Sequence, residues 1–177
     1  MEAVSPLVAL AMTEAQNMTE TQKLRRRIRF WLGAFIAGLA LSGLTAIPLS
    51  WELGILTRLV GHRFGGLSDW VFRVAGGLRE TDVRYPFIAY GTDWLAFGHL
   101  MIAVAFIGPY LEPVRNRWVI TFGLIACVSV LPWAFVFGPL RGIPFFWRLI
   151  DCSFGIAGLL PLLLVRRDIQ RLSSIDA

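Results

Sequence analysis

The sequence predicts an all-α protein, a four-helix transmembrane bundle with an amphipathic helix in a long outer loop. Hydrophobic residues make up 56% of the 177 residues and charged residues only 16%, whereas a soluble domain is typically about half apolar and about a quarter charged. The charges are also unevenly placed and leave long runs without any. Basic residues gather beside these runs, as they do at the ends of membrane spans. Too little polar surface remains to cover a soluble globule.

Residues 1–22 are mixed in character, and we expect them to form a mobile cytoplasmic tail ahead of a single four-span membrane domain, residues 23–177. The apolar run at residues 7–12 is too short to cross a bilayer, which takes about 20 residues. Glu2 precedes that run and no basic residue does. The segment therefore does not fit a secretory signal peptide.

The first span is predicted at residues 30–49, which carry no charge and directly follow a dense basic block at residues 23–29. A run of about 20 apolar residues matches a hydrocarbon core of about 30 Å, and the basic block marks the cytoplasmic end. Ala34, Gly38 and Ser42 are spaced four residues apart and give this helix a small face. Another helix can approach such a face closely in lipid.

The connection at residues 51–93 is too long and too charged to be a simple turn. Within it, apolar residues recur at helical spacing: Leu67, Trp70, Val71, Val74, Ala75 and Leu78. This pattern predicts a short amphipathic helix at residues 68–78 that rests on the membrane surface or on the bundle. Ser68 could cap its start, and the glycine pairs at 65–66 and 76–77 are expected to be hinges or helix ends. A weaker pattern predicts a turn of helix at residues 52–60.

The other three spans are predicted at residues 94–110, 118–137 and 145–165. Pro132 is expected to kink the third, and the segment 138–144 is expected to form a tight turn because it is rich in Gly and Pro. In the fourth span, Gly155 and Gly158 continue the face that carries Asp151. A glycine face is where another helix packs, so we expect Asp151 to point into the bundle.

The placement of basic residues predicts which ends face the cytoplasm. Ten basic residues lie on the side of the first block, and seven lie on the other side, five of them in the long loop. This bias places both termini in the cytoplasm. The basic residues are almost all Arg, a weak sign of a GC-rich bacterial genome. The expected location is therefore the bacterial inner (plasma) membrane, as a multi-pass protein. Because the arginines flank apolar segments, no nucleic acid is expected as a partner.

Familiar motifs of chemistry are absent from the sequence. No phosphate-binding glycine loop, paired-histidine metalloprotease helix or CxxC pair occurs. Cys127 and Cys152 lie in apolar segments and are interpreted as small hydrophobic residues. Of the two histidines, His62 lies in the outer loop and only His99 in a span, which disfavours haem ligation. No metal and no cofactor are predicted.

The candidate functional site is predicted from ionisable residues within the membrane spans. Such groups are costly in lipid and usually face the protein interior or a water-filled cavity. His99 and Asp151 lie about 6–8 Å below the outer interface, counted along their helices. Asp93 precedes His99, and Arg148 shares a helix face with Asp151. The hypothesis is one polar cluster of Asp93, His99, Arg148 and Asp151. The alternative is structural: a local Arg148–Asp151 pair, with His99 hydrogen-bonded to neighbouring backbone.

Three stretches resemble an uncharacterised family of small bacterial polytopic membrane proteins. They read YGTDWLAFGH (90–99), PVRNRWVI (113–120) and RGIPFFWRLIDCSFG (141–155). The resemblance covers roughly residues 90–165. It implies a polytopic membrane protein, and it implies neither an activity nor a catalytic residue.

The sequence thus favours a non-enzymatic membrane protein, an accessory or scaffold subunit or a small-ligand-binding subunit. The alternative is a membrane-embedded enzyme or a proton-coupled carrier that uses the Asp/His/Arg cluster. The expected partners are the lipid bilayer and, because small-residue faces permit it, a second copy of the chain or another membrane protein.

Overall fold

The computed structural model describes residues 6–175, with side chains at residue 12 and from residue 14 onward, and within this range it is helical. The elements are α1 (Pro6–Thr45), α2 (Leu49–Val60), α3 (Gly66–Arg84), the 3-10 helix η1 (Pro86–Ala89), α4 (Tyr90–Ala105), α5 (Ile107–Leu111), α6 (Arg117–Leu140) and α7 (Phe145–Ile175). Within the described residues, four stretches are long and apolar enough to cross a membrane: Glu14–Thr45, Pro86–Leu111, Arg117–Leu140 and Phe145–Ile175. The predicted all-α class with four spans and a helical outer loop is confirmed, and the chain is a multi-pass membrane protein that contacts lipid.

Prolines set two helix boundaries that differ from the predicted spans. α1 ends at Thr45 rather than at residue 49, because Pro48 disfavours helical geometry at the residue before it. The second span is divided at Phe106 into α4 and α5. Pro109 lacks the N–H that would bond to the carbonyl of Ala105, and its ring would collide with that carbonyl in a continuous helix.

Helices α1 and α6 extend beyond the predicted spans. α1 begins at Pro6, so residues 6–22 of the predicted tail are helical and continuous with the span, while residues 1–5 lie outside the described residues. The mobility of that tail stays a prediction. α6 continues to Leu140 and shortens the predicted turn to residues 141–144. In that turn Gly142 has a positive φ of 67°, which a residue with a side chain rarely adopts.

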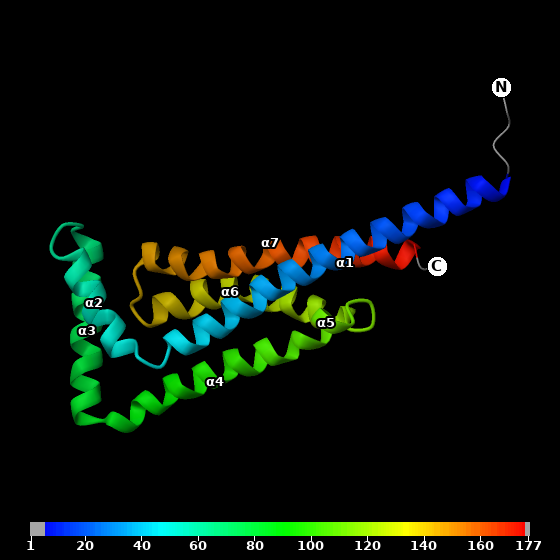
Figure 1. The fold of residues 1–177 in the computed structure, drawn as a ribbon. Coiled ribbons are helices and arrows are strands. Elements are labelled where there is room, and N and C mark those ends of the chain that lie inside the picture. Colours follow the sequence, from blue (N-terminus) through cyan, green and yellow to red (C-terminus); the bar gives the residue numbers. More distant parts are fainter. Residues whose placement is uncertain (1–5, 176–177) are drawn as a thin grey trace. The chain divides into compact units, whose positions relative to one another are not determined.

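Contacts divide the chain into two compact units. Unit 1 combines the chain up to Phe35 with the chain from Phe106 onward, and unit 2 is Ile36–Ala105. Unit 1 therefore holds the first part of α1 with α5, α6 and α7. Unit 2 holds the last part of α1 with α2, α3, η1 and α4 (Figure 1).

In unit 1, α6 and α7 are joined by the short turn and run side by side (Figure 1). Their close approach depends on glycine. A Cβ on Gly155 would lie 2.6 Å from the carbonyl oxygen of Cys127, and a Cβ on Gly158 would lie 2.8 Å from the Cys127 Sγ. The prediction that the Gly155/Gly158 face packs against another helix is confirmed. The partner is α6 at Cys127.

In unit 2, α2 and α3 form a helical hairpin that runs across the end of α4 (Figure 1). Gly61 and Gly65, both with φ of 50°, flank its turn. Leu53, Val60 and Val71 are buried between the two helices. The predicted amphipathic helix is thus present. Val71 of its apolar face is buried, and the other residues of that face are partly buried.

Two details of the predicted outer helix are wrong. The glycines at 76–77 lie inside α3, which continues to Arg84, because the apolar face on both sides of them holds the helix against α2. Ser68 does not cap the helix. Its hydroxyl oxygen accepts a hydrogen bond from the Phe64 N–H (3.1 Å) and so fixes the turn that precedes α3.

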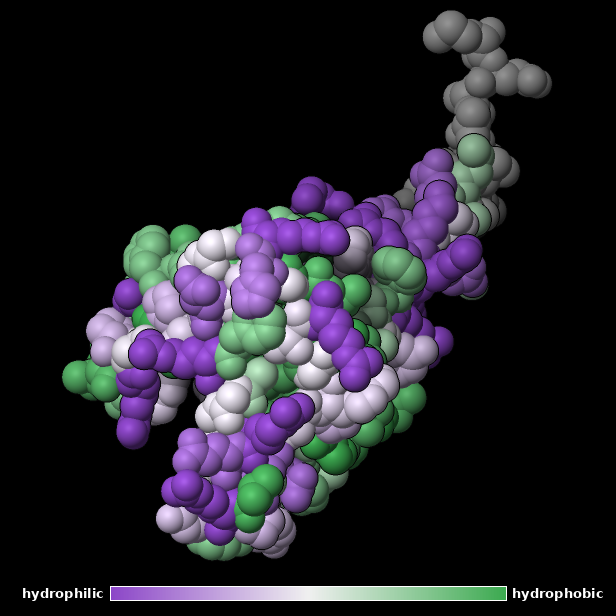
Figure 2. All heavy atoms as spheres, turned by 90° about the vertical axis from the view of Figure 1, so that its left-hand side faces the viewer, coloured by the Kyte–Doolittle hydropathy of each residue, from purple (hydrophilic) through white to green (hydrophobic). Residues whose placement is uncertain are grey.

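The face that α2 and α3 present is mixed rather than uniformly apolar. Figure 2 shows hydrophilic side chains crowded between hydrophobic ones on this side. Exposed arginines at 58, 63, 73 and 79 contribute the charge, and Trp51 and Leu59 are exposed beside them on α2. Such a mixture is typical of a segment at the lipid–water interface.

The small face predicted for the first span is not the one that packs within the chain. Ala34, Gly38 and Ser42 are exposed, and a Cβ on Gly38 would meet nothing within 4 Å. Instead α1 approaches α4 at Gly43, where a Cβ would lie 2.9 Å from the carbonyl oxygen of Ala96. Hydropathy does not distinguish the two faces, because the lipid-facing and helix-facing sides of a span are both apolar.

Candidate functional site

The four residues of the predicted polar cluster come from both units. Asp93 and His99 lie on α4 in unit 2, whereas Arg148 and Asp151 lie on α7 in unit 1. That they form one cluster stays a prediction.

His99 is held by its own helix and by α1. Its ring Nδ1–H donates a hydrogen bond to the carbonyl oxygen of Leu95 (2.8 Å). A Cβ added to Gly43 of α1 would lie 3.0 Å from the Cβ of His99. The close approach of α1 therefore fixes the position of the His99 backbone. Asp93 is exposed in the first turn of α4, where the positive end of the helix dipole favours a carboxylate.

Arg148 is positioned by an aromatic ring and a glycine. Its guanidinium carbon lies 5.3 Å from the centroid of the Phe145 ring, within the range of a cation–π interaction. A Cβ on Gly138 would overlap the Arg148 side chain, so that glycine leaves the room the side chain occupies. Asp151 is half-buried one turn further along α7. Among the residues that the structure describes, Arg148 and Asp151 do not form an ion pair with each other.

The predicted cluster has a specific energetic signature. Arg148→Ala should lower the thermal stability in detergent more than Arg166→Ala, which removes only a flanking charge. On the cluster hypothesis, His99→Ala and Asp151→Asn should be non-additive by about 0.5–3 kcal/mol, as residues that share a network are. Thermal unfolding of the single and double variants measures both effects. Strict additivity would mean that each residue acts only through its own local contacts.

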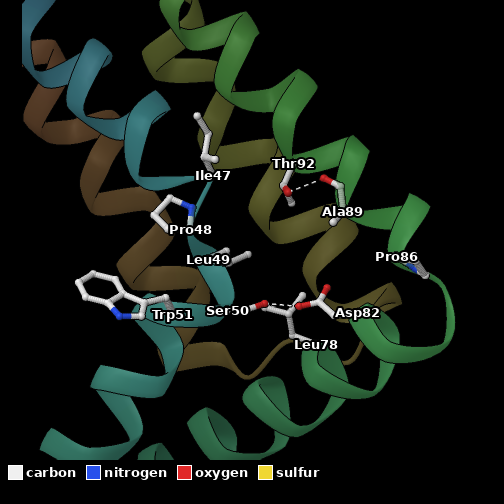
Figure 3. A pocket seen from close by; sticks show the side chains of 10 residues that line it. All are labelled: Ile47, Pro48, Leu49, Ser50, Trp51, Leu78, Asp82, Pro86, Ala89 and Thr92. Atoms are coloured by element: carbon white, nitrogen blue, oxygen red, sulfur yellow. Dashed lines mark hydrogen bonds between the residues drawn. The ribbon is translucent and has the colours of Figure 1, made fainter.

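A cavity in unit 2 was not predicted. We name it the corner pocket. Its volume is about 330 Å³, and it lies where α1 ends, α2 begins, α3 ends and α4 begins (Figure 3). It is lined by Ile47, Pro48, Leu49, Ser50, Trp51, Leu78, Asp82, Pro86, Ala89 and Thr92. Its size falls at the lower end of the range for small-molecule sites.

One side-chain hydrogen bond ties the corner pocket together. The Ser50 hydroxyl, in the first turn of α2, donates to Oδ2 of Asp82, near the end of α3 (Figure 3). Across the pocket, the Thr92 hydroxyl donates to the carbonyl oxygen of Ala89 (2.7 Å). Ser50 and Asp82 are 32 residues apart in the sequence, and no spacing rule connects them. Only the α2–α3 hairpin brings them together.

A second polar feature that sequence reasoning missed lies in unit 1. Asp168 of α7 is fully buried, and its Oδ2 lies 3.4 Å from Nε of Arg27 on α1. The sequence analysis did not single out Asp168, which follows Arg166 and Arg167 directly. A signal was nevertheless present: the neighbours Val165, Ile169 and Leu172 recur at helical spacing and are all buried. Asp168 lies on the edge of that apolar face.

In the described part of the chain, no group of three or more His, Cys, Asp or Glu side chains is placed so that it could hold a metal ion. A comparison with protein-family models, with curated proteins and with solved structures finds no match to this chain. The resemblance to a bacterial family therefore implies only a small polytopic membrane protein. The four long apolar helices agree with a small polytopic membrane protein.

Proposed function

We propose that this chain is a non-enzymatic accessory subunit of the bacterial inner membrane that binds a small ligand in the corner pocket. The observation that carries the proposal is the pocket itself, a cavity that combines apolar walls with the Ser50–Asp82 pair. A mostly apolar cavity with few converging polar groups is the usual form of a small-molecule site. No lining residue is a His, the side chain that most often acts as the general base for a serine nucleophile.

The surroundings of the polar cluster also favour a non-enzymatic role. An enzyme or proton carrier would need ionisable groups that face one another or a bound substrate. His99 instead bonds to the backbone of its own helix, and Arg148 lies over Phe145. Local contacts of this kind need no ligand to explain them.

The ligand-binding proposal is tested by filling the corner pocket. Ala89→Phe places a ring in the cavity, whereas the matched control Val83→Phe adds the same ring at a position that is 79% exposed on α3. The proteins are purified in a mild detergent, and the molecules that remain bound are measured by native mass spectrometry. The wild type and Val83→Phe should retain a bound molecule that Ala89→Phe loses. Identical bound species in all three proteins would contradict the proposal.

The proposed orientation has both termini and the loop at Arg115 in the cytoplasm and the α2–α3 hairpin outside. The excess of basic residues beside the first and last spans supports it. A fluorescent protein that matures only in the cytoplasm should fluoresce when fused after Ala177 and stay dark when inserted at Arg63 in the hairpin turn. Periplasmic phosphatase fusions at the same two positions should give the opposite pattern. Fluorescence from the Arg63 insertion would reverse the orientation.

A further inference from the structure

The side-chain hydroxyl and carboxylate groups that line the corner pocket are all acceptors toward a ligand. Ser50 uses its hydroxyl proton to bond Asp82, and Thr92 uses its own to bond the carbonyl oxygen of Ala89. Each hydroxyl oxygen therefore keeps lone pairs free, and a carboxylate can only accept. Two hydroxyl oxygens and one carboxylate form a set that complements a group with several donors and no acceptor.

The carboxylate of Asp82 also has no ion-pair partner within the described part of the chain. The nearby Arg84 pairs with Glu80 instead, with a distance of 3.5 Å between Nη1 and Oε1. Arg79 is exposed on α3. Among the described residues, the only partner of the Asp82 carboxylate is the Ser50 hydroxyl, so the pocket contains a carboxylate that a cationic ligand could compensate.

We expect the corner pocket to lie at the level of the lipid headgroups. Its lining residues come from the end of the first span, the start of the second and the hairpin between them. Exposed aromatic residues surround this level, namely Trp51, Tyr85, Tyr90 and Trp94, and such rings favour the membrane interface. The apolar walls formed by Ile47, Leu49 and Leu78 can cover a short carbon chain.

We infer that the corner pocket binds an alkylammonium group, with the ammonium on Asp82, Ser50 and Thr92 and the carbon chain against the apolar walls. An ammonium has three donors and no acceptor, which matches the acceptor set. The group can come from the headgroup of phosphatidylethanolamine or from a free amine of similar size. This inference rests on the proposed function, because it names the ligand class of the same pocket.

The test compares a charged probe with a neutral one of equal length. Binding of hexylammonium chloride and of 1-hexanol is measured by calorimetry on the full chain in detergent micelles, with empty micelles as the blank. Asp82→Asn should raise the Kd for hexylammonium by about tenfold or more, because a hydrogen bond to a charged group is lost. It should leave hexanol binding unchanged. The control Asp69→Asn removes the same charge from an exposed position on α3 and should change neither affinity.

The variants separate failure of the inference from failure of the proposed function. If Ala89→Phe abolishes binding of both probes and Asp82→Asn weakens neither, the pocket binds ligands and the ammonium assignment is overturned. If neither Ala89→Phe nor Asp82→Asn changes the affinity for either probe, both the ammonium assignment and the proposed function are contradicted. If Asp82→Asn does not fold, Ser50→Ala carries the test, with weaker hexylammonium binding and unchanged hexanol binding expected. An unchanged hexylammonium affinity in Ser50→Ala would then overturn the assignment.

A second arm identifies the source of the group. The wild type and Asp82→Asn are reconstituted in nanodiscs of mixed phosphatidylethanolamine and phosphatidylglycerol, and the retained lipids are measured by native mass spectrometry. Retention of phosphatidylethanolamine by the wild type, and its loss in Asp82→Asn, supports a lipid headgroup. Binding of free hexylammonium without selective lipid retention supports a soluble amine. Equal retention of both lipids by both proteins, together with no effect of Asp82→Asn on hexylammonium, contradicts the inference.

Discussion

Gly155→Ala should destabilise the protein by about 1–3 kcal/mol, although alanine is the better helix former. The added Cβ would lie 2.6 Å from the carbonyl oxygen of Cys127. Backbone cannot rotate away as a side chain can, so α6 and α7 must separate and lose contacts along their length. Overpacking of a close contact typically has a cost of this size. Gly155→Leu should be worse, because a larger side chain requires a larger separation.

The matched control is Gly38→Ala on α1. A Cβ there would meet nothing within 4 Å, so this substitution should be neutral, or slightly stabilising through the higher helix propensity of alanine. Unfolding of the variants in mixed micelles with increasing denaturing detergent measures the difference. A Gly155→Ala protein as stable as Gly38→Ala would show that the two helices do not depend on this contact. A strongly destabilised Gly38→Ala would instead indicate that its face is covered by another chain.

Arg27→Ala should be the most damaging change among the arginines of the first basic block, with a loss of about 3 kcal/mol. Its partner Asp168 is fully buried, while the Arg27 side chain is 51% exposed. Removing Arg27 leaves a carboxylate without its counter-charge among Val165, Ile169 and Leu172. Breaking a buried pair from one side typically costs about 3–5 kcal/mol, and the exposure of Arg27 places the loss at the lower end of this range.

The burial difference also predicts an asymmetry between the two partners. Asp168→Leu removes the buried charge and leaves Arg27 free to turn toward water, so it should cost less than Arg27→Ala. The double variant Arg27→Ala/Asp168→Leu should recover most of the stability lost in Arg27→Ala, because no charge then remains buried. The control Arg25→Ala removes an exposed arginine two residues away and should have little effect. A double variant no more stable than Arg27→Ala alone would contradict this account of the pair.

Most of the architecture was predictable from the sequence, since hydropathy and charge act locally along the chain. The residues at 30–49 and 118–137 are long uncharged runs, and any such run forms a helix in lipid because its backbone groups must bond internally. The amphipathic pattern from Leu67 to Leu78 predicted a helix in the outer loop for the same local reason. The proline effects at Pro48 and Pro109 were also readable in principle, because they act on the residues directly before them.

The faces on which the helices pack were decided only by the tertiary structure. Lipid is as apolar as a protein core, so the packed side of a span looks no different in sequence from its lipid-facing side. The sequence offered Ala34, Gly38 and Ser42 as a packing face, but Gly43 is the glycine of α1 that meets α4. The glycine face of α7 was found because two glycines, Gly155 and Gly158, coincide on it.

Pairings between distant residues were likewise beyond the sequence. In the sequence Asp168 directly follows two arginines, and only the structure shows that it is buried beside Arg27 of another helix. Ser50 and Asp82 meet because the hairpin turn at Gly61 and Gly65 reverses the chain between them. The sequence by itself determined the class of the protein, its four spans and the helix of its outer loop, because those depend on local hydropathy and on backbone hydrogen bonding in lipid. The tertiary structure alone decided which polar groups pair and where a pocket lies, because these depend on the rotation of each helix about its axis, which small differences in side-chain packing set.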